Sequence, residues 1–345
     1  MQTLQEIMAR FYPKINIKNI EKLKNKTILI TGASGLVGSN IIAYLDFLNE
    51  QYNLNIKVLG IVRSGTEKWM SQSNKIRYLQ QDLSREKLKE TIKFNYLIHL
   101  ATYGQPKKFL AHPRETVELN IHVLFDLLEL AKKNKAAFLY PSSSEIYGEA
   151  DEKHIPTEES YYGYVNTLSE RAIYAESKRL AETICYLYNK IVPIKICRLL
   201  ICYGPGVKYD DQRVYCEFIK KAQNTGKIVM MDEGKAQRTL CFISDAVEMI
   251  LNILLNAKEM VYNISGRETV SIKKLAEIIA KINHATVSRK LNWKEISGTP
   301  ARSALSNKKY VREFNKKKFI SLKEGLTTTS LWFENLKMSN NHEHK

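Results

Sequence analysis

The chain of 345 residues has no long hydrophobic run and no recognisable leader. A membrane-spanning helix needs about 20 consecutive apolar residues, and a secretory signal needs a charged segment, an apolar segment and small residues in that order. Neither pattern occurs in the sequence. We therefore expect a cytoplasmic protein with no membrane partner.

Cysteine patterns and metal-binding patterns are also sparse. The cysteines are odd in number and form no Cys-x-x-Cys pair, and the seven histidines form no His-Glu-x-x-His pair. Neither a disulfide framework nor a zinc site is therefore indicated. We expect no metal, and buried free thiols at Cys185, Cys197, Cys202, Cys216 and Cys241.

Acidic residues are in deficit, because 36 Asp and Glu face 53 Lys and Arg, which gives a formal net charge of +17. Such a charge suits a polyanion, either nucleic acid or a diphosphate substrate, but it also follows from a composition rich in Lys and Asn throughout. The sequence contains no nucleic-acid-binding module and no array of alternating aromatic and basic residues, so we expect no nucleic-acid partner. The 44% of hydrophobic residues suffices for a large core.

What the sequence does contain is a regular alternation of two hydrophobic patterns. Short β-rich runs predict strands, and longer runs with apolar residues three and four apart predict helices. Strands are expected at 27–31, 56–62, 96–100, 136–142 and 194–200, with helices ending near 48 and spanning 116–133 and 171–188. The alternation predicts an α/β protein of the Rossmann type, a doubly wound parallel sheet covered by helices.

The pattern changes near both ends of the chain. Residues 1–25 carry apolar residues at helical spacing and predict a helical extension before a dinucleotide-binding domain over 26–203. From there the alternation breaks, so 204–337 is expected to be mainly a smaller C-terminal substrate-binding lobe, with its clearest strand at 261–264. The polar tail, 338–345, is expected to be disordered.

A glycine-rich turn follows the first expected strand. Gly32 permits a tight turn, Gly35 lets the backbone approach a pyrophosphate, and Gly38 lets helix and sheet pack closely. An ordinary strand-to-helix turn can also use glycines, but the position after the first strand favours a dinucleotide. We expect NAD or NADP as cofactor, held at this turn by Gly32, Ser34, Gly35, Leu36, Val37 and Gly38.

The ends of the next strands carry further candidates for cofactor binding. NAD-binding proteins normally place an acid after the second strand to receive the ribose hydroxyls, but this chain has Val62 and Arg63 there. Arg63 is either a ligand of the 2′-phosphate of NADP or a solvated side chain. Asp82 either accepts a hydrogen bond from the adenine amino group or caps a helix. The remaining residues expected at the cofactor are Leu83 and Leu100.

Tyr174 and Lys178 are one helical turn apart, so their side chains share a face of the helix. The ammonium of Lys178 would lower the pKa of the phenol, and the phenolate would take the proton of a substrate alcohol as hydride leaves its carbon. With 19 tyrosines, such a pair also arises by chance. Upstream, Ser142–Ser144 either bring hydroxyls to the carboxyl end of a strand, where ligands bind, or form a serine-rich turn.

The glycine turn, the serine cluster and the Tyr/Lys pair occur in this order and spacing in the extended short-chain dehydrogenase/reductase family, which the chain resembles over about 26–326. Within that family it looks most like UDP-glucuronate decarboxylases and related nucleotide-sugar enzymes. The local matches are Ser143–Gly148, Tyr162–Asn166, Arg171–Arg179, Tyr203–Gly206, Asp210–Val214 and Gln237–Asp245.

The resemblance implies a role for each matching residue. Ser143 would lie beside the sugar oxygen and Tyr174 would be the catalytic base. Lys178 would activate this base and bind the ribose, and Asn120 would be a structural or relay residue.

Two further residues are implied near a sugar carboxylate. Arg238 would hold it through a bidentate pair, and Glu145 would orient it or manage a proton. The plain alternatives are a surface arginine and a turn carboxylate. The substrate-binding residues implied in this way are Ser144, Asn166, Arg213, Arg238 and Arg302, of which Arg213 and Arg302 would contact the diphosphate or uridine.

The implied reaction begins with oxidation of the sugar C4 hydroxyl by the bound nicotinamide. A C6 carboxylate makes the 4-ketone a β-keto acid, which loses carbon dioxide, so decarboxylation of a UDP-hexuronate is expected. A 4,6-dehydratase or a 4-epimerase remains open, although Ser144 and Glu145 stand where dehydratases carry an Asp-Glu pair. A catalytically idle dinucleotide-binding sensor or scaffold is the alternative from another class.

Two departures from the family pattern bear on these expectations. Relatives commonly read Arg-x-Phe-Asn before Tyr-Gly-Pro, whereas Ile201 stands here at the place of an expected polar substrate contact. The missing acid at Val62 and Arg63 leaves the choice between NAD and NADP open. The family also implies a homodimer, formed through the helices near Thr116 and Tyr174.

Overall fold

The computed structural model describes residues 2–290 and 301–342. Its main sheet has seven parallel strands in the order β10-β6-β5-β4-β1-β2-β3. The strands are β1 (Thr27–Thr31), β2 (Lys57–Val62), β3 (Ile76–Gln80), β4 (Tyr96–His99), β5 (Ala137–Ser143), β6 (Ile194–Leu199) and β10 (Val261–Ile264). The predicted doubly wound sheet is confirmed, and each expected strand agrees with an observed one to within one residue at each end.

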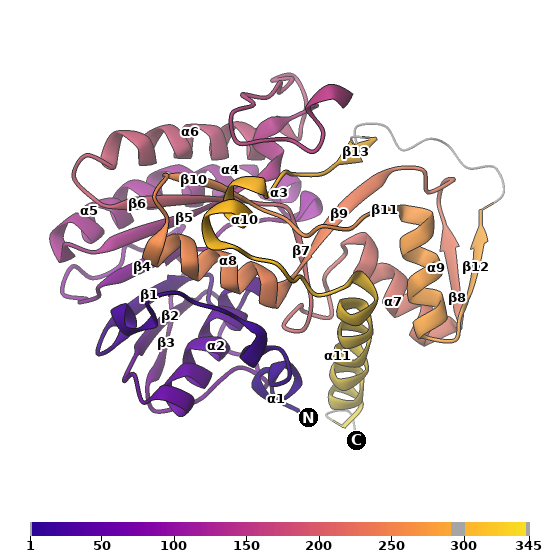
Figure 1. Cartoon of the computed structure of the whole chain (residues 1–345), viewed down its shortest axis with the longest axis horizontal. Coiled ribbons are helices and arrows are strands. Elements are labelled where there is room, and N and C mark those ends of the chain that lie inside the picture. The colour runs from indigo at the N-terminus through magenta and orange to yellow at the C-terminus, as the bar shows by residue number, and fades with distance from the viewer. Residues whose placement is uncertain (1, 291–300, 343–345) are drawn as a thin grey trace.

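Helices cover both faces of this sheet (Figure 1). They are α2 (Leu36–Tyr52) and α8 (Ile243–Asn256) on one face and α5 (Val123–Asn134) and α6 (Ala172–Tyr188) on the other. Side chains alternate along β1, so that Ile28 and Ile30 join the core on the side of α2, whereas Leu29 joins the core on the side of α5. The strand order reverses between β1 and β4, and ligands bind at the carboxyl ends of strands beside such a reversal.

The helix that was expected to begin at Thr116 is interrupted. The elements in this region are α4 (Pro113–Val117), the π-helical turn η3 (Glu118–His122) and then α5. The wider turn holds the buried Asn120, whose side chain donates to Ser177 Oγ and accepts from Thr102 Oγ1. Because π-turns of this kind occur often at functional sites, this one marks where the chain departs from regular helix to place a polar group.

The segment after Gly204 is divided between two parts of the molecule. Strand β10, expected in the smaller lobe, pairs with β6 as an edge of the main sheet. Helix α8 packs against this part of the core, and nearly all of its residues are therefore buried. The other elements are β7 (Ile201–Tyr203), α7 (Val214–Thr225), β8 (Lys227–Met230), β9 (Gln237–Phe242), β11 (Thr269–Ser271), α9 (Ile272–Ile282), β12 (Thr286–Arg289), β13 (Arg302–Ser303) and α10 (Lys308–Phe314).

The N-terminal segment lies beside the last helix (Figure 1), with Gln2 N donating to Asn335 Oδ1 at 3.1 Å. The N-terminal extension consists of α1 (Leu4–Met8), η1 (Tyr12–Lys14) and η2 (Ile20–Leu23), so its predicted helix is present but short. The tail is helical further than expected, because α11 (Leu322–His342) continues past Lys337. The last three residues of the predicted disordered tail lie outside the described residues.

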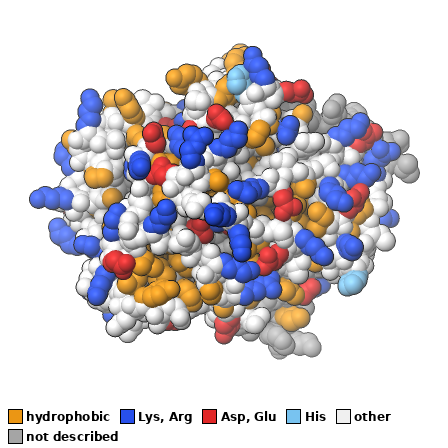
Figure 2. Space-filling view, in the orientation of Figure 1, with side chains coloured by type: hydrophobic (Ala, Val, Ile, Leu, Met, Phe, Trp, Pro, Cys, Tyr) orange, Lys and Arg blue, Asp and Glu red, His pale blue; other side chains and the backbone are white. Residues whose placement is uncertain are grey.

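Two expectations about composition can be compared with the fold. All five cysteines are buried free thiols, as predicted. Among the described helices, none combines the length and the apolar character that crossing a membrane requires. Figure 2 shows Lys and Arg side chains spread over the visible face, among acidic ones, rather than gathered into one patch.

Candidate active site

The glycine turn has a geometry that only glycine permits. Gly32 has φ +67°, and a Cβ built on it would lie 2.7 Å from the backbone carbon of Leu100. A Cβ on Gly38 would lie 2.5 Å from Gly32 O. Helix α2 begins at Leu36 and no side chain caps it, so its first N–H groups are free to bind an anion. The turn therefore fits the pyrophosphate of a dinucleotide.

Beside this turn lies a hollow of about 370 Å³, the adenosine pocket. The predicted cofactor residues that line it are Gly32, Ser34, Gly35, Leu36, Arg63, Asp82, Leu83 and Leu100. Arg63 donates to the hydroxyl of Tyr103, and its guanidinium lies 5.2 Å from the centroid of that ring. The Arg63 side chain is thus directed along the pocket wall by an aromatic partner that the sequence did not indicate.

Asp82 is engaged in the turn that it begins. Its Oδ1 accepts from Ser84 N at 3.1 Å and from Ser84 Oγ at 2.7 Å. Partial burial raises the pKa of Asp82, but the bonds from Ser84 outweigh it and leave the pKa below its usual value. No helix begins at Asp82, so the helix-capping alternative is wrong, and these bonds belong to a turn. Asp82 lines the pocket, and its bond to adenine stays a prediction.

A larger cavity of about 640 Å³, the catalytic cavity, adjoins the adenosine pocket, because the glycine turn and Leu100 line both. The residues from the sequence-based site that line it are Gly32, Gly35, Leu36, Val37, Gly38, Leu100, Ser143, Ser144, Glu145, Tyr174, Arg213 and Arg238. Ile201, the departure from the family pattern, also lines it. The structure therefore brings the predicted cofactor turn and the predicted catalytic residues into one continuous trench.

Tyr174 and Ser143 meet in this cavity at the ends of α6 and β5. A hydrogen bond joins the two side chains. Phe109, from α3 (Pro106–Ala111), stacks on the Tyr174 ring with the centroids 4.8 Å apart and the planes at 6°. Burial raises the pKa of Tyr174 above its usual range, the bond with Ser143 lowers it only in part, and the charge of Glu145 raises it further. Loss of water around the phenolate is the largest of these effects, and the lowering of this pKa by Lys178 stays a prediction.

Lys178 lies behind Tyr174 and is almost completely buried. Its Nζ donates to Pro141 O at 2.9 Å and lies 4.6 Å from the ring centroid of Tyr140 and 5.9 Å from that of Tyr174. Burial lowers the pKa of Lys178 to about 7, although the charges of Cys185 and Glu182 oppose this. An ammonium in this place is therefore held by a carbonyl and an aromatic face rather than by a carboxylate.

Three charges meet at the far end of the catalytic cavity. Glu145, on η4 (Ser144–Tyr147), accepts from Arg171 NH2 at 2.8 Å. Arg238 extends from β9, where burial lowers its pKa, the charge of Glu145 raises it and the charge of Arg171 lowers it. Glu145 and Arg238, the two residues expected near a sugar carboxylate, are therefore close enough for the charge of one to shift the pKa of the other. Arg171 is a second arginine in the same group.

The other predicted substrate residues are placed differently. Arg213 lines the cavity, but its guanidinium is bound to Asp211 at 2.6 Å and to Cys202 O at 3.0 Å. Arg302 is exposed, and its neighbour Ser303 lines the cavity in its place, because successive side chains of β13 alternate. Asn166 is exposed and accepts from Leu168 N at 3.0 Å. The structure thus does not bring Arg302 and Asn166 to the site.

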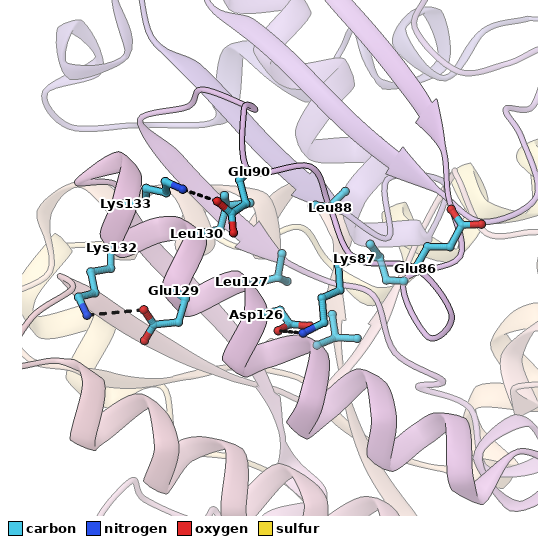
Figure 3. A pocket seen from close by; sticks show the side chains of 12 residues that line it. Glu86, Lys87, Leu88, Glu90, Asp126, Leu127, Glu129, Leu130, Lys132 and Lys133 are labelled. Atoms are coloured by element: carbon cyan, nitrogen blue, oxygen red, sulfur yellow. Dashed lines mark hydrogen bonds and ion pairs between the residues drawn. The ribbon is translucent and has the colours of Figure 1, made fainter.

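Another hollow, of about 570 Å³, lies between α5 and the segment before β4. Figure 3 shows that Lys87 pairs with Asp126, Lys133 with Glu90 and Lys132 with Glu129 around it. Each of its three lysines pairs with a carboxylate, and no predicted catalytic residue lines it. We therefore place the active site in the trench.

Comparison with known proteins agrees with this geometry. The model of the NAD dependent epimerase/dehydratase family matches residues 28–265. The chain belongs to this family. UDP-glucuronic acid decarboxylase 1 of Xenopus tropicalis is 28% identical over 284 residues, which cover 82% of this chain and 66% of the Xenopus protein.

Solved structures share the fold of this chain. UDP-glucose 4-epimerase from Thermotoga maritima, with UDP-glucose, superposes with a TM-score of 0.78 at 22% identity and covers 90% of this chain and 99% of that one. UDP-glucuronic acid 4-epimerase from Bacillus cereus, with UDP-glucuronic acid and NAD, gives 0.74 at 23% identity with the same coverage.

Three residues of the candidate site were not found from the sequence. Arg171 lies three residues before Tyr174 on the same helical face, so its spacing was a usable signal. Phe109 and Tyr103 carry no such signal, because each meets its partner only through the tertiary fold. They supply the aromatic surfaces of the catalytic cavity and of the adenosine pocket.

Proposed function

We propose that this protein oxidises the C4 hydroxyl of a UDP-hexuronate and decarboxylates the resulting β-keto acid. The observation that carries the proposal is the group of Glu145, Arg171 and Arg238 in the same cavity as Ser143 and Tyr174, because it supplies cations for a carboxylate beside a base for an alcohol. The likeness to a protein named UDP-glucuronic acid decarboxylase supports this choice.

The residues of the trench fit a nicotinamide dinucleotide. The free N–H groups of α2 and the close backbone approach at Gly32 would hold the pyrophosphate, and the adenosine pocket would take the remainder. When bound, the nicotinamide supplies reversible acceptance of hydride. We propose NAD as the cofactor, with NADP as the alternative because Arg63 offers a guanidinium to a 2′-phosphate.

Each side chain of the site then has its own role in the reaction. Ser143 donates a hydrogen bond to the C4 oxygen, and Tyr174 accepts its proton. In its protonated form, Lys178 stabilises the phenolate from behind, because it is almost completely buried and water screens its charge little there. Phe109 covers one face of the Tyr174 ring and excludes water from the base. Arg238 holds the sugar carboxylate while Glu145 orients it.

We further propose a homodimer formed by α5 and α6. These helices and the turn after them expose apolar side chains to solvent, namely Phe125, Leu180, Tyr186, Leu187 and Ile191. Such exposure on two adjacent helices favours burial against a second copy. Light scattering after size exclusion should give twice the mass of the chain, and Leu180→Glu with Leu187→Glu should give one chain mass; a monomeric unmodified protein would refute the dimer.

The decisive experiment incubates the purified protein with UDP-glucuronate, with and without added NAD, and follows carbon dioxide and the nucleotide sugar by mass spectrometry. We expect loss of carbon dioxide, reduced by about 10²- to 10⁴-fold in Tyr174→Phe. That variant keeps the ring that stacks on Phe109 and removes only the hydroxyl. Loss of water or inversion at C4 in a panel of nucleotide hexoses, without decarboxylation, would contradict the proposal in favour of a dehydratase or an epimerase.

A further inference from the structure

Arg171 reaches the catalytic centre from the same helical face as the base. Residues 171, 174 and 178 are three and four apart, so their side chains lie along one side of the start of α6. The Arg171 guanidinium lies 5.8 Å from the centroid of Phe109, the ring that stacks on Tyr174. A ligand that touches Tyr174 is therefore within reach of Arg171 as well.

The hydrogen-bonding capacity of Arg171 is only partly used. A guanidinium has five N–H donors in a planar fork, and among the described residues the one acidic partner of Arg171 is Glu145, through a single bond of 2.8 Å. The side chain is 28% exposed and lines the catalytic cavity. Its remaining donors are therefore available to a second acceptor that enters the cavity.

The charges at this end of the cavity leave one positive charge in excess. Glu145 contributes one negative charge, and Arg171 and Arg238 contribute two positive charges. Arg213 does not change this balance, because Asp211 neutralises it. The other two charged residues that line the cavity, Lys107 and Asp232, have opposite charges. A monoanionic group on the substrate would complete the balance, whereas a neutral hydroxymethyl group would leave a partly buried cation uncompensated.

We propose that Arg171 selects a sugar with a carboxylate, by exchanging its bond with Glu145 for a bond with the carboxylate of the substrate. This inference rests on the proposed function. Glu145 then competes with the substrate for the same guanidinium and keeps the hold on the carboxylate loose. A loose hold serves decarboxylation, because the carboxylate charge leaves that group as carbon dioxide forms, and tight binding of the ground state would slow this step.

The test measures binding of UDP-glucuronate, UDP-glucose and UDP to the NAD-loaded protein by titration calorimetry, with Tyr174→Phe present in the reference protein and in every variant so that turnover does not disturb the titration. The unmodified protein should bind UDP-glucuronate more tightly than UDP-glucose. In Arg171→Gln the affinity for UDP-glucuronate should fall by about 10- to 100-fold, as expected for loss of a charge-assisted bond, while the affinity for UDP-glucose changes little. Arg171→Lys keeps the charge without the planar fork of donors. Its affinity for UDP-glucuronate should lie between those of the unmodified protein and Arg171→Gln.

Two further variants make the result specific. Glu145→Gln removes the competitor, so it should bind UDP-glucuronate more tightly and turn it over more slowly, a split between KM and kcat that a merely structural role would not produce. Arg312→Gln removes an exposed guanidinium from α10, away from the cavity, and should change neither affinity. If Arg171→Gln does not fold, the affinities of Arg171→Lys and Glu145→Gln for UDP-glucuronate still test the role of Arg171.

The outcomes separate the two proposals. If the unmodified protein prefers UDP-glucuronate and the Arg171 variants retain the full preference, the role of Arg171 is wrong and the proposed function stands. If the unmodified protein binds UDP but shows no preference for UDP-glucuronate over UDP-glucose, the proposed substrate is wrong and the role of Arg171 fails with it.

Discussion

The trench has two halves that share one glycine turn but differ in how much water reaches them. In the catalytic half, Tyr174 and Lys178 are buried, and burial is the largest cause that moves both pKa values away from their usual ranges. In the adenosine half, Arg63 is exposed and Asp82 is only partly buried. The same kinds of polar group are thus desolvated at one end and solvated at the other.

This difference determines what each half can contribute. Charges in a dry cavity interact strongly and are sensitive to small changes in their neighbours, whereas exposed charges are screened and contribute little each. We therefore expect substitutions in the catalytic half to change rates and pH profiles, and substitutions in the adenosine half to change preference among cofactors.

The largest effect is expected from Lys178→Met. Methionine fills much the same volume but removes the ammonium that stands behind Tyr174. The rate of carbon dioxide release from UDP-glucuronate should fall by about 10²- to 10⁴-fold, because the phenolate loses its stabilising charge. An unchanged rate would show that the buried amine does not stabilise the phenolate. The difference in burial between the two halves would then not affect catalysis.

The same residue should make stability depend on pH. The pKa of Lys178 is about 7 in the folded protein against 10.5 for an ordinary lysine, so between these values the unfolded chain binds more protons and stability rises with pH. Below about pH 7 both states are protonated and the full cost of burying the charge is present.

Urea unfolding at several pH values measures this effect. Stability of the unmodified protein relative to Lys178→Met should rise by about 1.4 kcal/mol per pH unit, or roughly 2–3 kcal/mol from about pH 7 to about pH 9. Parallel pH profiles of the two proteins would mean that Lys178 keeps an ordinary pKa and that the catalytic half is wetter than its packing indicates.

The features found from sequence are those that depend on spacing within one element. Gly32 to Gly38 belong to one turn, and Tyr174 and Lys178 to one helix, so neighbouring residues were enough to identify them. Arg171 has the same kind of spacing and could have been included. For each of these, local geometry already fixes where the side chain lies.

The features missed depend on packing between distant segments. Phe109 reaches Tyr174 only because α3 folds over α6, and no periodicity in either segment records this contact. The effect of burial on the Tyr174 pKa was missed for the same reason, since the neighbouring lysine is visible in the sequence but the exclusion of water is not. Arg302 was assigned from the family resemblance alone, and a two-residue strand is too short for its sequence to show which side chain faces inward.

A smaller effect is expected at the turn that joins the two halves. In Gly38→Ala the new Cβ would lie 2.5 Å from Gly32 O, so α2 must move away from the turn. We expect a loss of roughly 1–3 kcal/mol in stability, as for overpacking of a close contact, together with weaker NAD binding measured by fluorescence titration.

Gly226→Ala is the matched control for this change. Gly226 also has a positive φ, of +64°, but a Cβ there would meet nothing within 4 Å. It should lose about 1 kcal/mol of stability through backbone strain alone and bind NAD as before. Equal loss of NAD binding in both variants would indicate that general destabilisation, rather than the approach of the backbone at Gly38, limits the cofactor site.

The smallest effect is expected from Arg63→Ala in the solvated half. If the guanidinium meets a 2′-phosphate, the affinity for NADP should fall by about tenfold while the affinity for NAD changes by less than about twofold, and added salt should weaken the difference. Arg85→Ala, an exposed arginine beside Asp82 on the same side of the pocket, serves as control. An equal fall for NAD and NADP would mean instead that Arg63, held by Tyr103, contacts the adenine ring common to both, so that the adenosine half would discriminate by stacking rather than by charge.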